Sequence, residues 1–155
     1  MTFMRTIFFI LASIITAAGA SVTHAAVHNV STSAALQAAL DKAVAGDEIV
    51  LADGTYAGEF SIRSFSGTSG APITVRAANR HKAIMQGNNV CSRFEEGFVV
   101  QKSHWIIKDL KFKDHGRAIS IYAPKVEFSH NIIDHFREEG VRVENTSGVN
   151  ISKMK

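Results

Sequence analysis

The sequence has few of the residues that commonly stabilise small extracellular folds or interrupt regular structure. Its 155 residues include a single cysteine, Cys91, so no disulfide bond can form within the chain. A small fold without disulfides must draw its stability from an efficiently packed core. We expect Cys91 to be a half-buried small residue, with a reactive or intermolecular thiol as the alternative. Only two prolines and one tryptophan occur, against ten phenylalanines. This aromatic content favours the pleated surfaces of β-strands.

No stretch of the chain concentrates charge of one sign. The formal net charge is +3, the sequence pI is about 9.2, and acidic and basic residues alternate without a long basic run. This pattern argues against nucleic acid as a partner, and it permits an acidic polymer. With 46% hydrophobic and 20% charged residues, the composition fits one globular domain rather than a disordered or collagen-like chain.

The beginning of the chain differs in composition from the rest. Arg5 precedes the apolar run IFFILASIITAAGA, which is too short and has too little flanking charge for a membrane span. Small residues follow, so residues 1–26 are predicted to be a signal peptide of a secreted or periplasmic protein that has no membrane anchor after cleavage. Cleavage after Ala20, Ala25 or Ala26 fits this pattern, and the sequence does not choose among them. An uncleaved anchor is the alternative.

Apolar residues recur along the chain at a nearly constant interval of roughly 20 residues, a period typical of repeat architectures. Phe98, Ile119 and Val141 follow one another at this interval. The same spacing relates two further sets, which are Val100, Ile121 and Val143, and Ile107, Phe128 and Ile151. Within each segment apolar and polar residues alternate, as in a strand with one buried face. The intervening KDHG, APK and NTSG are interpreted as turns.

Such short recurrent strands predict an all-β fold, a right-handed parallel β-helix over residues 27–155. No single strand can build a core, but equivalent strands stacked about 4.8 Å apart share one. Leucine-rich repeats need several leucines in every repeat, and here Leu110 stands in one repeat alone. At the position equivalent to Leu110 the next repeat has Asn131, which either points into the stack and bonds the backbone or lies in a solvent-exposed turn.

A short amphipathic helix is predicted over about residues 33–45, before the repeats. Candidate N-caps and a candidate stop, Gly46, flank it. The N-cap candidates are Ser31, Thr32 and Ser33, and the apolar face comprises Leu36, Ala39, Leu40 and Val44. The first coil of a solenoid exposes apolar side chains and unpaired backbone, and we expect this helix to cover it.

The order of the helix, AGDEIVLADGTYAG, SGAPITVRA, HWIIKDLKFKD and VEFSHNIID resembles the opening of secreted right-handed parallel β-helix proteins. Within that group it is most similar to polysaccharide lyases of the alginate lyase and chondroitinase B type, over roughly residues 30–155. The resemblance implies β-elimination on uronate polymers, with Lys or Arg as base and calcium or Arg as neutraliser. The expected positions of these groups lie beyond Lys155. We therefore assign no catalytic residue, no metal ligand and no cofactor here, and expect calcium only in a fuller protein.

Two similar charged segments are the candidate substrate-binding site. The segment KDHGR contributes Asp114, His115 and Arg117, and DHFREE contributes Asp134, His135, Arg137 and Glu138. Stacked one coil apart, they would form a mixed-charge strip in which Arg grips carboxylates and His exchanges protons with an acidic polysaccharide. Solvated turns with local salt bridges are the alternative.

Other charged and aromatic residues give weaker signals. The basic cluster of Arg76, Arg80, His81 and Lys82 is interpreted as a solvated loop. We expect Trp105 to be buried in the stack rather than to stack on a sugar, because it shares its register with apolar residues. No zinc site is predicted.

The final segment, GVNISKMK, supplies one more strand and then nothing that would cover it. We therefore expect the sequence to be a fragment of a longer protein, inactive alone, or a subunit whose end is covered by a partner chain. The predicted function is that of the N-terminal portion of a secreted carbohydrate-active β-helix protein, most like a uronate polysaccharide lyase. A non-catalytic β-helix that binds glycan or forms a structural surface module is the alternative.

Overall fold

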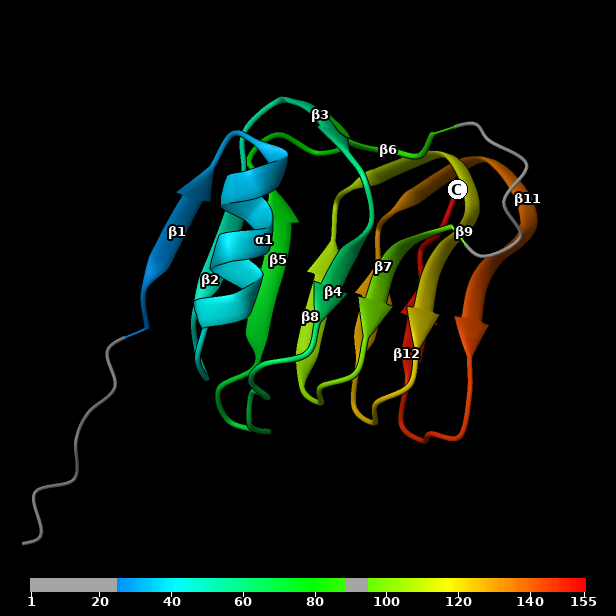
Figure 1. The fold of residues 1–155 in the computed structure, drawn as a ribbon. Helices are drawn as coiled ribbons and strands as arrows, with labels where there is room; N and C mark the ends of the chain where they lie inside the picture. The colour runs from blue at the N-terminus through cyan, green and yellow to red at the C-terminus, as the bar shows by residue number, and fades with distance from the viewer. Residues whose placement is uncertain (1–24, 89–94) are drawn as a thin grey trace, which may run out of the picture.

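The computed structural model, which describes residues 25–88 and 95–155, is a stack of short parallel strands with one helix (Figure 1). Cys91 and nearly all of the predicted signal peptide lie outside the described residues. The elements are β1 (Val27–Val30), α1 (Ser33–Lys42), β2 (Glu48–Leu51), β3 (Gly54–Ala57), β4 (Phe60–Ile62), β5 (Ile73–Ala77), β6 (Ala83–Gln86), β7 (Glu96–Val100), β8 (Trp105–Lys108), β9 (Lys111–Ile121), β10 (Glu127–Ser129), β11 (Ile132–Val143) and β12 (Asn150–Ser152).

The strands form two parallel sheets that face each other across the core. One has the order β1-β2-β5-β8-β10-β12, and the other β3-β6-β9-β7-β4, with β11 also paired to β9. The register places Ile119 beside Phe98 and Val141, and Phe128 beside Ile107 and Ile151. Residues one repeat apart are therefore neighbours in successive coils, and the predicted parallel β-solenoid is confirmed. Strands β1 and β6 were not predicted from the sequence.

The core is built from rows of inward-facing side chains that run along the stack. Four phenylalanines also form a chain of ring contacts that runs from β4 and β7 across the core to β10. The ring centroids of Phe60 and Phe98 are 5.6 Å apart, those of Phe98 and Phe112 are 6.0 Å apart, and those of Phe112 and Phe128 are 5.5 Å apart. These spacings fall within the range in which aromatic pairs stabilise beyond their buried area. Trp105 is fully buried as predicted, and its indole Nε1 donates to the carbonyl of Phe65 at 3.0 Å.

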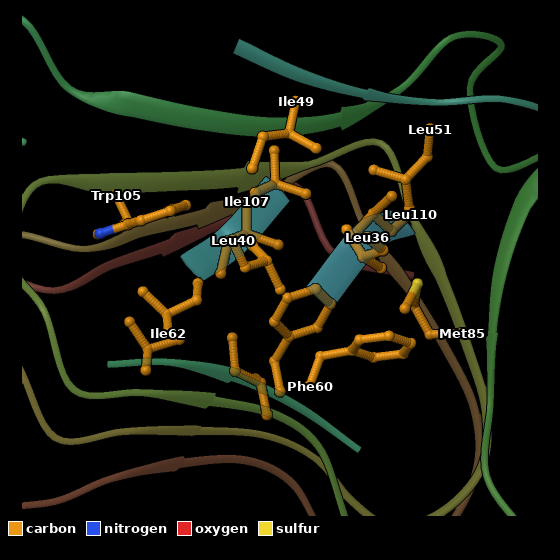
Figure 2. Close-up of a cluster of buried hydrophobic side chains, with 14 of the residues drawn as sticks. Leu36, Leu40, Ile49, Leu51, Phe60, Ile62, Met85, Trp105, Ile107 and Leu110 are labelled. Atoms are coloured by element: carbon orange, nitrogen blue, oxygen red, sulfur yellow. The ribbon is translucent and has the colours of Figure 1, made fainter. Parts of the chain in front are cut away.

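Helix α1 covers the first coil, as predicted. The side chain of Thr32 caps it by accepting a hydrogen bond from the Ala35 amide at 3.2 Å. Leu36 and Leu40 are fully buried, and Figure 2 shows both among core side chains that include Ile49, Phe60 and Ile62.

The predicted end of the helix was wrong. Helix α1 ends at Lys42 rather than near residue 45, and Val44 is 41% exposed instead of facing the core. The cause is local, because the amide of Val44 donates to the carboxylate of Asp47 at 3.0 Å instead of continuing the helical pattern.

Asn131 points into the stack, which resolves the choice left open by the sequence. Its Oδ1 accepts from the Leu110 amide at 2.9 Å, and its Nδ2 donates to the Ile107 carbonyl at 2.9 Å. The side chain is fully buried, and it connects two successive coils at the corner that follows β10. A buried amide is tolerated here because both of its ends are hydrogen-bonded.

At the end of the stack opposite α1, the inward-facing residues of the last coil are half exposed. Phe136 is 52% exposed, Ile151 44% and Val143 42%. No helix among residues 25–88 and 95–155 is long and apolar enough to cross a membrane.

Candidate functional site

The two charged segments lie on strands β9 and β11, not in turns. Each strand bends once at a residue with positive φ, Asp114 at 57° and His135 at 54°. The prediction that KDHG forms a turn was therefore wrong. Backbone pairing continues through the bend, and a single residue in the left-handed region supplies the change of direction. Asp is among the residues that tolerate this conformation best.

The segments are not in register residue for residue. Lys113 pairs with Asp134, and His115 pairs with Phe136 rather than with His135. Between Phe136 and Glu139 the register shifts, so that Arg117 pairs with Glu139. An extra residue in one of two paired strands is a β-bulge, and it re-aims the side chains that follow. The bulge brings two acidic residues of β11, Glu138 and Glu139, to Arg117.

His115 lies inside the solenoid, not on the predicted strip. It is 3% exposed, and its Nε2 lies 3.1 Å from the carbonyl of Met85, to which it donates. Its Nδ1 is buried without a hydrogen-bond partner. Burial lowers the pKa of His115, against the opposing effects of the Met85 carbonyl and of Glu95, Asp114 and Glu59. The assignment of His115 as a substrate-contacting residue is corrected, because its ring is enclosed.

Arg117 is the centre of the charged strip, and its guanidinium is surrounded by carboxylates. Its Nη2 donates to Glu138 Oε2 at 2.8 Å, its Nη1 lies 3.7 Å from Glu96 Oε1, and its Nε lies 3.7 Å from Glu139 Oε2. The Arg117 side chain is 12% exposed. Three carboxylates for one guanidinium leave this cluster with an excess of negative charge, and Arg117 is already engaged within the protein.

The remaining predicted residues lie on the outside of the same sheet. Lys111 Nζ is 2.9 Å from Asp134 Oδ2, and this ion pair holds the pKa of Asp134 below its ordinary value. The side chain of His135 is 79% exposed, and its Nδ1 lies 3.1 Å from Asp134 Oδ1. Arg137 is exposed. Asp114 faces Lys113 and accepts from the side-chain amide of Gln86 at 3.0 Å.

Sequence reasoning missed two members of the strip, Glu96 and Arg142. Glu96 pairs in register with Arg117, and its Oε1 accepts from the Ser120 hydroxyl at 2.5 Å. Arg142 pairs with Glu144 and lies 3.9 Å from Glu139 Oε2. The interval between Glu96 and Arg117 equals the coil repeat, and this spacing in the sequence could have predicted their contact.

In the basic cluster, the two arginines pair with acidic residues that lie outside the cluster. Arg76 contacts Glu48 at 2.5 Å, and Arg80 contacts Asp109 at 3.1 Å. A hollow of about 480 Å³ is lined by Pro124, Asn145, Thr146 and Ser147, none of which was predicted to bind a ligand. In the part of the chain that the structure describes, no group of three or more His, Cys, Asp or Glu side chains is placed to hold a metal ion.

Solved structures with a similar fold include alginate lyases. An alginate lyase from Paenibacillus sp. str. FPU-7 shares 27% identity, with a TM-score of 0.60 over 81% of this chain and 58% of its own. The family 6 alginate lyase AlyGC shares 27% identity, with a TM-score of 0.57 over 71% of this chain and 16% of its own. A mannuronic acid specific family 6 lyase from human gut microbiota, at 24% identity and a TM-score of 0.57, covers 70% of this chain and 26% of its own. This chain thus spans less than two thirds of each.

A search of curated proteins gave no significant match. The sequence profile of the Pel9A-like right-handed β-helix region matches residues 14–154, which is most of the chain. This match agrees with the parallel register of the strands and with the solved lyases that share the coil arrangement. The chain therefore belongs to the Pel9A-like right-handed β-helix family.

Proposed function

We propose that the chain is part of a secreted or periplasmic carbohydrate-active β-helix protein that acts on acidic, uronate-containing polysaccharide by β-elimination. One observation carries this proposal, the shared coil arrangement and 27% identity with the Paenibacillus alginate lyase over 81% of the chain. A shared fold alone does not determine chemistry, so the substrate class has to be tested directly.

The surface offered to the polymer is the strip on β9 and β11. Arg117 positions the acidic side chains there and is engaged by them, whereas Arg137 and His135 are exposed and available to a ligand. An exposed guanidinium can grip a uronate carboxylate through two parallel hydrogen bonds. Because the Arg117 cluster carries excess negative charge, we propose that binding centres on Arg137 and that Arg117 holds its shape.

The proposed protein is larger than this chain. The alignments support this, since the chain spans 58% of the Paenibacillus lyase and 16% of AlyGC. The half-exposed inward side chains of the last coil, Phe136 and Ile151, would be covered by a further coil or by a partner chain. We propose that β-elimination, and any calcium that assists it, belongs to the fuller protein, and that the chain alone contributes binding.

Retardation of the purified chain in gels that contain alginate, chondroitin or pectate tests binding. We expect retardation by at least one of these polymers and a clear loss of it in Arg137→Gln. The matched control is Arg63→Gln, which removes the same charge from another exposed position and should leave retardation unchanged. Equal loss in both variants would show that net charge alone drives binding.

Turnover is tested by the ultraviolet absorbance of unsaturated uronate, measured with the fuller protein and with the chain alone. We expect new absorbance with the fuller protein only, and its loss on calcium chelation if calcium is the neutraliser. Polymer binding by the fuller protein without any new absorbance would replace the lyase proposal by that of a non-catalytic glycan-binding β-helix.

A further inference from the structure

A buried carboxylate near the start of the described chain, Asp47, has no permanently charged partner. Its side chain is 4% exposed, and the carboxylate is hydrogen-bonded through both oxygens. Oδ1 accepts from the Ala26 amide at 2.9 Å, and Oδ2 accepts from the Val44 amide at 3.0 Å and contacts His28 Nε2 at 3.0 Å. Of the side-chain ion pairs among the described residues, Asp47 makes only the one with His28, which carries charge only when protonated.

These bonds hold the carboxylate in its ionised form. Burial alone would raise the pKa of Asp47, but the amides of Val44 and Ala26 together with His28 outweigh burial and lower it. An ionised carboxylate with so little exposure is most stable when a positive charge faces it. The atom best placed to carry that charge is the Ala26 nitrogen, which already lies at hydrogen-bonding distance.

We propose that the signal peptide is cleaved between Ala25 and Ala26 and that the new α-ammonium group of Ala26 forms an ion pair with the buried carboxylate of Asp47. The step is hydrolysis of one peptide bond. Water adds its hydroxyl to the Ala25 carbonyl carbon, and the bond to the Ala26 nitrogen breaks. The released amine takes up protons and is an ammonium at neutral pH. The inference rests on export, which is part of the proposed function, but it does not depend on any action on polysaccharide.

The structure argues against cleavage one residue later. The Ala26 carbonyl accepts from the Glu48 amide at 2.8 Å, and β1 begins at the next residue, with Val27 paired to Glu48. Removing Ala26 would break that bond and the bond from its amide to Asp47, and would fray the edge of the first sheet. Ala25 and Ala26 are both exposed, but the two hydrogen bonds just described are made by Ala26. Cleavage before Ala26 therefore keeps every contact just described.

Charge decides between Ala25 and Ala20 as the residue before the cleaved bond. After cleavage at Ala20 the nitrogen of Ala26 would remain a neutral amide with a single proton to donate. After cleavage at Ala25 it becomes an ammonium with three donors and a full charge, and hydrogen bonds between charged groups are roughly twice as strong as neutral ones. Thr23 and Ala25 are small enough for the signal-peptidase pattern at the bond between Ala25 and Ala26. Ala18 and Ala20 fit the same pattern at the bond that follows Ala20, so the pattern alone does not choose between the two bonds.

The first test is N-terminal sequencing and intact mass of the full chain after export to a bacterial periplasm. The expected N-terminus is Ala26, and a mature protein that begins at Ser21 or Val27, or that retains the leader, overturns the proposal. Ala25→Gln places a large side chain before the cleaved bond and should abolish the Ala26 N-terminus. The matched variant Ala20→Gln should leave it in place, and the reverse pattern would assign processing to Ala20.

The second test measures the ion pair in the unaltered exported protein, so it does not depend on a variant folding. NMR titration of the isotope-labelled protein, followed at Ala26, should give a midpoint for the α-amine above the ordinary range of about 7.7–8.0. The groups facing this amine are the Asp47 carboxylate and, on the far oxygen of that carboxylate, His28. A midpoint within the ordinary range would show that the amine does not pair with Asp47.

Discussion

Replacing Asn131 by leucine removes the hydrogen bonds that link two coils while keeping an inward side chain of similar size. The Leu110 amide loses its acceptor in a fully buried site, and an unsatisfied buried donor costs about 1–3 kcal/mol. The Ile107 carbonyl loses one donor, which adds about 0.5–1.5 kcal/mol for an ordinary hydrogen bond. We therefore expect the free energy of unfolding to fall by about 1.5–4.5 kcal/mol.

Urea unfolding of wild-type and Asn131→Leu protein measures this loss, provided that the slope of the transition is unchanged. The matched control is Asn150→Leu on the neighbouring β12, where the side chain is exposed and the expected change lies within about 0.5 kcal/mol. A loss below about 1 kcal/mol in Asn131→Leu would contradict the reasoning, because it would mean that leucine packing at this corner outweighs two buried hydrogen bonds.

Three further predictions concern His115, Arg117 and Phe98. Because burial lowers the pKa of His115 below 6.5, the unfolded state takes up a proton at a higher pH than the folded state does. The thermal midpoint should therefore fall as the pH drops below 6.5. A fall of the same size in His115→Gln would exclude His115 as the cause. Arg117→Met should lower the free energy of unfolding by about 1–2 kcal/mol in low salt, because Glu96 and Glu138 lose the guanidinium that they share. The control Arg137→Met, at an exposed position on the same strand as Glu138, should change it by less than about 0.5 kcal/mol. Phe98→Ala should cost about 3–5 kcal/mol in chemical unfolding, because it removes the ring that contacts both Phe60 and Phe112. A cost no larger than that of Phe65→Ala, at a half-exposed position, would refute these ring contacts as a stabilising element.

The charged site was predictable only in part. The sequence identified β9 and β11 as carriers of similar charged segments, and Arg117 and Glu138 do meet there. His115, chosen by the same reasoning, lies in the core, because the backbone bends at Asp114 and turns the next side chain inward. Glu96 was missed because it lies on β7, outside the two similar charged segments, although β7 and β9 pair in register.

The sequence by itself determined the coil. Its nearly constant repeat interval and its alternation of apolar and polar residues are local properties of the chain, and stacking is the arrangement in which such short strands bury their apolar faces. Tertiary structure alone decided the bulge between Phe136 and Glu139, the partners of Arg117 and the placement of Ala26 against Asp47. Each of these depends on how one coil sits against another, and a shift of one residue in that pairing turns a side chain from the surface to the core.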